Sequence, residues 1–182
     1  MGLGKDYERQ DCSLARALEF VGERWTLLVV RDAFYGVRRY SDFLAHLDIP
    51  RAVLADRLQT LVDAGVLDKR RYQQSPPRDE YLLTGKGREL WPALYALAQW
   101  GERHMSAAGP RRVFHHEPCG TRLDGMAFCP VCGGAAPPED VEIRPGPGAD
   151  PSLRDDPVSR ALREPHRLLR PLLEAPSARR TG

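Results

Sequence analysis

The segment from residue 39 to residue 84 changes its hydrophobic period from that of helices to that of strands, and this order limits the possible fold. A short helical pattern at 39–47 is followed by the tight turn "LDIP" and a longer helical pattern at 50–65, where Pro50 and Gly65 suit the two ends. The short runs "VLDKRRY" and "RDEYLLT" then predict a hairpin whose tip is the polar segment "QQSPP". This order predicts a mainly α fold with a small β-hairpin wing, a winged helix-turn-helix.

Helical patterns flank this segment on both sides. We expect Ser13 to cap a first helix and Ser41 to cap the helix at 39–47, because serine is favoured at helix N-caps. The segment 23–36 predicts a helix that is apolar all round at its centre, which is typical of a buried helix. The segment 85–105 predicts a long helix, kinked or restarted near Pro92, whose apolar stripe is wider than a small domain needs.

The composition divides the chain into three predicted parts. Residues 1–108 are rich in Leu, Ala, Val and Arg and form the winged helix domain. Residues 109–144 carry three of the four cysteines and predict a small Cys-rich, ribbon-like lobe. Residues 145–182 are rich in Pro and are expected to form a largely disordered tail.

The overall charge is nearly balanced. The 27 Lys and Arg against 25 Asp and Glu give a net charge of +2, so any nucleic-acid face must come from local clustering of cations. No apolar run is long enough for a membrane span, and the charged N-terminus has no secretory signal pattern. We therefore expect a soluble cytoplasmic protein without a membrane partner.

Polar and basic residues gather on the second helix of the predicted pair and on the hairpin. Such a helix fits the major groove of duplex DNA, and cations on the adjacent hairpin can contact phosphates. Either feature alone is more often an ordinary solvated surface, whereas both in this order favour DNA binding. Asp56 is better explained as an orienting partner for an arginine. The predicted DNA contacts are Ser41, Arg51, Arg57, Gln59, Thr60, Arg70, Arg71, Gln73, Gln74 and Arg78.

Several motifs are similar to those of one known family. The segment "GERWTLLVVRDAFYG", the "RYSD" motif, and the run "LADRLQTLVDAGVLDKRRYQQSPPRDEYLLTGKG" resemble the HxlR-type regulators, relatives of the MarR group. The resemblance covers residues 12 to about 104 and departs where "VGERW" replaces the usual Ile-Gly-Gly-Lys-Trp. It implies a homodimeric transcription regulator, a repressor on a pseudo-palindromic operator, with the N-terminal helix and the helix 86–106 forming the dimer.

The cysteines suggest two further roles. Cys12 near a helix N-terminus is a candidate redox thiol, although a small buried Cys is the commoner explanation. Cys119, Cys129 and Cys132, with His116 or His115, can form a Cys₃His site for a structural Zn²⁺; a ribbon-like lobe that has lost its metal is the alternative.

Aromatic residues of the first domain are candidates for a small-molecule effector pocket. These residues are Trp25, Phe34, Tyr35, Tyr95 and Trp100, although aromatics at helical spacing more often belong to a core. No pattern of catalytic residues is present, so we do not expect an enzyme. The alternative function is a zinc-ribbon and winged-helix module for protein interactions.

Overall fold

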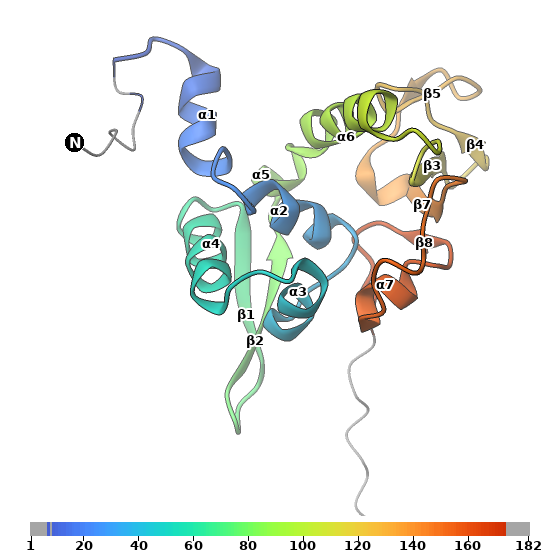
Figure 1. Cartoon of the computed structure of the whole chain (residues 1–182). Helices are drawn as coiled ribbons and strands as arrows, with labels where there is room; N and C mark the ends of the chain where they lie inside the picture. Colours follow the sequence, from blue (N-terminus) through green and yellow to red (C-terminus); the bar gives the residue numbers. More distant parts are fainter. Residues whose placement is uncertain (1–6, 8, 174–182) are drawn as a thin grey trace, which may run out of the picture.

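The computed structural model describes residue 7 and residues 9–173, and the first half of the chain folds as a winged helix-turn-helix (Figure 1). Its elements are α1 (Ser13–Val21), α2 (Thr26–Phe34), α3 (Tyr40–Leu47), α4 (Arg51–Asp63), β1 (Leu67–Gln73) and β2 (Arg78–Leu83). β1 and β2 pair antiparallel from Leu67 opposite Leu83 to Gln73 opposite Arg78, with one irregularity between Arg71 and Gln73. The predicted fold class is therefore confirmed.

Two helices connect this domain to a smaller β-rich lobe. α5 (Gly85–Arg88) ends before α6 (Trp91–Met105), in agreement with the predicted interruption near Pro92. The lobe contains β3 (Arg112–His116), β4 (Thr121–Arg122), β5 (Phe128–Cys129), β6 (Gly134–Ala135), the short 3₁₀ helix η1 (Pro138–Asp140), β7 (Val141–Pro145), α7 (Pro157–Ala161) and β8 (His166–Arg167). Four strands form a sheet in the order β4-β3-β7-β8, and β5 pairs separately with β6.

The core of the first domain is built around α2. Val29, Val30 and Phe34 of α2 are completely buried, as the apolar run in this helix predicts. Leu54, Leu58 and Leu61 lie on one face of α4 and are buried at helical spacing, which leaves the opposite face of α4 in solvent. The buried face fixes the orientation of the exposed one.

A buried ionic network joins α2 to α3. The Asp32 carboxylate is fully buried, accepts hydrogen bonds from the Arg31 guanidinium at 2.7 and 2.9 Å, and lies 2.7 Å from Nδ1 of His46. A buried carboxylate is retained only when such partners compensate for its desolvation. The network therefore helps to set the position of α3 against α2.

The predicted serine caps are wrong. The N-cap position of α1 is Cys12 and that of α3 is Arg39, and neither makes a side-chain capping hydrogen bond. Ser41 lies inside the first turn of α3, where its hydroxyl donates to the Asp42 carboxylate at 3.0 Å. Local propensity favoured serine, whereas the packing of the apolar faces sets where each helix begins.

Residues 145–173, which were expected to be disordered, are folded. Val158 and Leu162 of the α7 segment and Leu168 after β8 are buried. This segment returns to the first domain, where the Leu169 N–H donates to the Phe34 carbonyl at 2.8 Å and the Leu172 N–H donates to the Gly36 carbonyl at 3.1 Å. Its few apolar residues are enough because they insert into a surface that the first domain already provides. The division into three domains stays a prediction.

No helix within the described part of the chain is long and apolar enough to cross a membrane.

Candidate functional site

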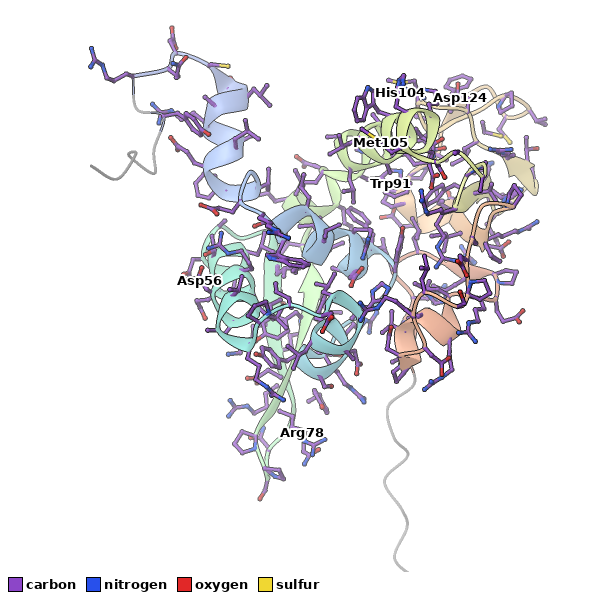
Figure 2. All side chains as sticks on the ribbon, in the orientation of Figure 1. Asp56, Arg78, Trp91, His104, Met105 and Asp124 are labelled. Atoms are coloured by element: carbon purple, nitrogen blue, oxygen red, sulfur yellow. The ribbon has the colours of Figure 1, made fainter. Side chains whose placement is uncertain are left out.

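The α4 helix and the β1–β2 hairpin form one continuous exposed region of the first domain. The hairpin extends beyond α3 and α4 and ends in a tip that projects away from the rest of the domain (Figure 1). Asp56 on α4 and Arg78 at the hairpin tip both project outward (Figure 2). We call α4 together with this hairpin the reading face.

The exposed residues of α4 are arranged by its buried face. Arg51, Asp56 and Gln59 are exposed, and the Tyr40 hydroxyl donates to the Arg51 carbonyl at 2.9 Å. This hydrogen bond fixes the first turn of α4 against α3, so the Arg51 side chain starts from a well-defined position. The geometry suits a helix whose N-terminal residues meet base edges in the major groove.

Other predicted contacts on α4 already have partners within the protein. The Arg57 guanidinium is largely buried and lies 3.7 Å from the Glu23 carboxylate, and it also donates to the Asp56 carboxylate. This agrees with the interpretation of Asp56 as the partner of an arginine. The Gln59 amide donates to Asp63 at 2.7 Å, and Thr60 is half-buried. Arg51 is therefore the better placed of the predicted α4 cations.

The cations on the hairpin strands are held by carboxylates. Arg70 pairs with Asp68 at 2.7 Å, while Arg71 and Lys69 lie 3.0 and 3.4 Å from the Asp79 carboxylate. The hydrogen bond from Arg71 lowers the pKa of Asp79 below its usual value, and Lys69 adds to this effect. These pairs are exposed, so phosphates can compete for the arginines at little cost.

The hairpin tip carries an exposed cation and two amides. Gln73 donates to the Ser75 carbonyl at 3.0 Å, and Gln74 and Arg78 are exposed. Among the described residues, no carboxylate lies within ion-pair distance of Arg78. This side chain can therefore reach a phosphate or a groove without breaking an existing ion pair.

Four side chains of the C-terminal lobe meet in a separate cluster. One ligand atom from each of His116, Cys119, Cys129 and Cys132 lies within 4.8 Å of every other. The Cys119 sulfur lies 3.3 Å from Nδ1 of His116 and 3.5 Å from the Cys129 sulfur, and the Cys132 N–H donates to the Cys129 sulfur at 3.4 Å. Of the two histidines that the sequence left open, the structure brings His116 into the cluster.

The local hydrogen bonds change the pKa of two thiols in this cluster. Hydrogen bonds from Thr121, with help from His116 and Cys129, lower the pKa of Cys119 to about 6. Hydrogen bonding to Cys119 and Cys129 raises the pKa of Cys132 to about 11. Metal ions bind cysteine as the thiolate. Cys119 therefore loses its proton readily, whereas Cys132 would need a bound cation to favour its deprotonation.

Three of the five predicted pocket aromatics line a cavity of about 800 Å³ between α2, α6 and the C-terminal lobe. These are Phe34, Tyr35 and Tyr95. Trp25 and Trp100 do not line it, and Trp100 lies on the exposed side of α6. Sequence reasoning missed Trp91, which packs between Phe34 and Tyr95 with ring centroids 5.3 Å from each.

Cys12 lies exposed at the beginning of α1, with no disulfide partner among the described residues. Its redox role stays a prediction.

This fold, with an exposed helix beside a basic wing, defines the class of winged helix-turn-helix transcription regulators. The model of HxlR-like helix-turn-helix proteins matches residues 20–108. The uncharacterised HTH-type transcriptional regulator Rv3095 of Mycobacterium tuberculosis is 44% identical over 137 residues, which cover 75% of this chain and 87% of that protein. The uncharacterised HTH-type regulator YdeP of Bacillus subtilis is 31% identical over 106 residues, covering 56% of this chain and 83% of its own. This chain belongs to the HxlR-like helix-turn-helix family.

Solved structures agree with this assignment. PA1607, described as a candidate transcription factor, has a TM-score of 0.51 and 40% sequence identity, covering 56% of this chain and 70% of its own. A MarR-family protein from Porphyromonas gingivalis W83, described as a candidate transcriptional regulator, has a TM-score of 0.50 and 27% identity, covering 53% and 95%. The relatives are transcription regulators and not enzymes, as predicted from the absence of a catalytic pattern.

Proposed function

We propose that this protein regulates transcription by binding duplex DNA through the reading face, as a homodimer on a pseudo-palindromic operator. The observation that carries the proposal is the position of Arg51 at the beginning of the exposed α4, beside a hairpin that carries Arg70, Arg71 and Arg78. The α4 helix would enter the major groove, and the hairpin cations would bind the adjacent phosphates. Occupation of an operator that overlaps a promoter would make the protein a repressor.

The homodimer in this proposal follows from exposed apolar side chains on two helices. Only Ala15 of α1 is buried, and α1 stands away from the rest of the domain (Figure 1). Leu14 is 66% exposed, and Leu97 and Trp100 of α6 are 52% and 48% exposed. Apolar side chains gathered in this way typically mark an interface. A second copy that packs against α1 and α6 would cover them and place two α4 helices on one side of the dimer.

A mobility-shift titration tests DNA binding. The probe is the DNA upstream of the protein's own gene, with random duplex as competitor, at two salt concentrations. We expect binding that resists the competitor and weakens as salt rises, because phosphate contacts release counterions. Absence of binding to any duplex at low salt would contradict the proposal and favour the protein-interaction module. Binding equal to that of random duplex would contradict an operator at this position.

We further propose that the cluster of His116, Cys119, Cys129 and Cys132 holds a structural Zn²⁺. Tetrahedral zinc with bonds of about 2.3 Å to sulfur places its sulfur ligands about 3.8 Å apart, and the Cys119 and Cys129 sulfurs are already 3.5 Å apart. Three sulfurs and one imidazole complete the four positions that a structural zinc uses. Zinc would join the turn after β3 to the β5–β6 hairpin and stabilise the lobe.

Zinc content measured by mass spectrometry tests this second proposal. We expect one zinc per chain in the protein purified without chelators, and a lower Tm after the metal is removed with a chelator. Cys129→Ser should lose the zinc, whereas Cys12→Ser, which removes a thiol outside the cluster, should keep it. Zinc-free protein that takes up no zinc on reconstitution would contradict a metal site.

A further inference from the structure

A cavity lies between the winged helix domain and the C-terminal lobe, and residues of both parts form its walls. One wall is formed by the end of α2 and by α6, and the other by residues beyond 108, among them Arg112, Phe114 and Leu162. The matched family region ends at residue 108, so the second wall lies outside it. Its volume of about 800 Å³ is in the range of sites for small organic ligands.

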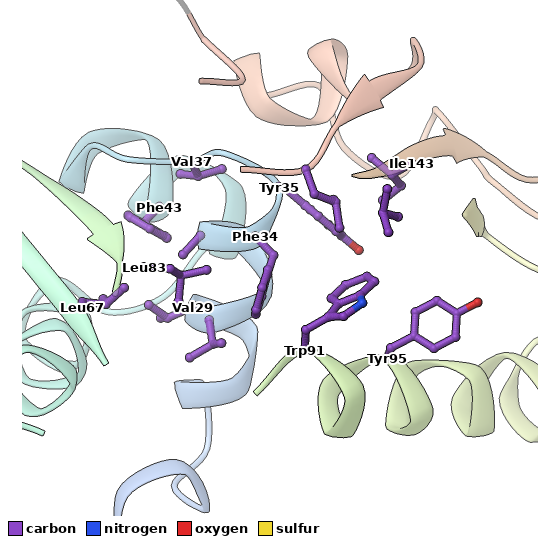
Figure 3. Close-up of a cluster of buried hydrophobic side chains, with 14 of the residues drawn as sticks. Val29, Phe34, Tyr35, Val37, Phe43, Leu67, Leu83, Trp91, Tyr95 and Ile143 are labelled. Carbon is purple, nitrogen blue, oxygen red and sulfur yellow. The ribbon is translucent and has the colours of Figure 1, made fainter. Parts of the chain in front are cut away.

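Aromatic rings form much of the cavity lining. Phe34 and Tyr35 come from the end of α2, and Trp91 and Tyr95 come from α6 and face them (Figure 3). The Phe114 ring completes this group, with its centroid 5.8 Å from that of Trp91 and 5.1 Å from that of Tyr95. These rings are at most 8% exposed, so they form the floor of the cavity. The exposed apolar surface of its lining is supplied by Leu28, Met105 and Leu153.

Cations outnumber carboxylates at the same cavity. Arg112 donates to the Leu162 carbonyl at 2.6 Å, and among the described residues no carboxylate lies within ion-pair distance of its guanidinium. Arg31 also lines the cavity, but Asp32 neutralises it. Glu102 lines the cavity too, and its carboxylate accepts a hydrogen bond from the Arg111 backbone N–H at 3.0 Å. Arg112 is therefore a partly buried cation without a bound counterion.

The pKa of Arg112 agrees with a missing anionic partner. Burial and the nearby charge of Arg31 lower this pKa, and Tyr35 and the Glu102 carboxylate only partly offset them, so an anion beside the Arg112 guanidinium would stabilise its charged form.

We propose that this cavity binds an aromatic organic anion, with its carboxylate or sulfonate on Arg112 and its ring system against the exposed apolar lining of Leu28, Met105 and Leu153. The proposal concerns a site that is independent of the reading face, so it does not require that the protein binds DNA. Because the site joins α2 to the C-terminal lobe, a bound anion would hold the two parts together.

A fluorescence titration with two matched probes tests the proposal. Anilinonaphthalene sulfonate carries an aromatic body with an anionic group, and N-phenyl-1-naphthylamine has the same aromatic body without the charge. We expect one sulfonate probe per chain, bound roughly tenfold or more tightly than the neutral probe, since a charge-assisted hydrogen bond to Arg112 supplies that difference. Equal affinities for the two probes would overturn the anion site.

Two pairs of variants locate the bound probe. Arg112→Gln should weaken the sulfonate probe about tenfold and leave the neutral probe unchanged, whereas Arg103→Gln on the exposed side of α6 should change neither. Gly101 lines the cavity, and a Cβ placed there meets no atom within 4 Å. Gly101→Phe should therefore fill the cavity and abolish binding, while Gly101→Ala should preserve it. Full binding to Gly101→Phe would place the probe elsewhere and overturn the proposal even if Arg112→Gln fails to fold.

Discussion

Arginine side chains on the reading face differ in how firmly the protein already holds them. Arg57 is enclosed by the Glu23 and Asp56 carboxylates, whereas Arg51 and Arg78 have no ion-pair partner among the described residues. A side chain that must first leave a part-buried ion pair gains less from a phosphate than one that is already in solvent. Arg57 therefore serves mainly to hold α4 against the segment before α2.

The contrast between Arg51 and the hairpin arginines gives the first prediction for single residues. Arg51→Ala should weaken binding to the operator more than binding to random duplex, because the variant has no side chain to reach a base edge. Arg70→Ala and Arg71→Ala should weaken binding to both. Each should also reduce the slope of log K against log salt by about one for each phosphate that its arginine neutralises.

Mobility-shift titrations at several salt concentrations measure both effects. Arg122→Ala is the matched control, because it removes an exposed arginine of the C-terminal lobe, away from the reading face and from the proposed dimer helices, and it should leave binding and salt slope unchanged. Equal reductions in affinity for operator and random duplex with Arg51→Ala would remove Arg51 from base recognition.

Sequence patterns predict which residues lie on the reading face, but they do not predict which ion pairs these residues form. The positions of Arg51, Arg70 and Arg78 follow from the periods of α4 and the hairpin. The pairing of Arg57 with Glu23 depends instead on how the turn before α2 packs near α4, which no local pattern encodes. The same holds for Trp91, because its place beside Phe114 requires a lobe from a distant part of the sequence.

At the scale of elements, the turn after α2 has a backbone requirement that only glycine meets. Gly36 has φ +88°, and a Cβ at this position would lie 1.7 Å from the Arg170 carbonyl oxygen. The helix predicted over 23–36 ends at this glycine, and the structure gives Gly36 a second role as the contact point of the returning C-terminal segment. That second role depends on residues 168–172, which composition alone assigned to a disordered tail.

Gly36→Ala is therefore expected to destabilise the protein by about 1–3 kcal/mol or more, because it combines a left-handed backbone with a backbone clash. Urea unfolding monitored by circular dichroism measures the free energy of unfolding. Gly101→Ala is the control, since its added Cβ lies in open space within α6, and it should stabilise the protein by about 0.5–1 kcal/mol. A Gly36→Ala protein as stable as the wild type would contradict the close contact with residue 170.

At the scale of the whole molecule, the exposed apolar residues of α1 and α6 form the proposed dimer interface. We therefore predict that a charged side chain introduced on α6 separates the dimer into monomers. Leu97→Glu places a carboxylate in the proposed interface, where its burial would be unfavourable. Light scattering coupled to size exclusion should give the mass of a dimer for the wild type and of a monomer for this variant. Met126→Glu is the control, because Met126 is 73% exposed on the C-terminal lobe.

A wild-type protein that is monomeric at all concentrations would contradict the dimer. A Leu97→Glu protein that remains dimeric would place the interface elsewhere on the surface. If the dimer separates as expected, operator affinity should also fall, because two linked reading faces bind more tightly than one.

The return of the C-terminal segment to Phe34 and Gly36 has a consequence for how the protein is made. A chain leaves the ribosome N-terminus first, so α2 emerges long before its hydrogen-bond partners at Leu169 and Leu172 exist. The end of α2 and the rings around Trp91 therefore stay incompletely covered until residues 168–172 have been synthesised. A chain that is truncated before residue 168 would therefore keep the complete reading face but leave the end of α2 exposed on the opposite side.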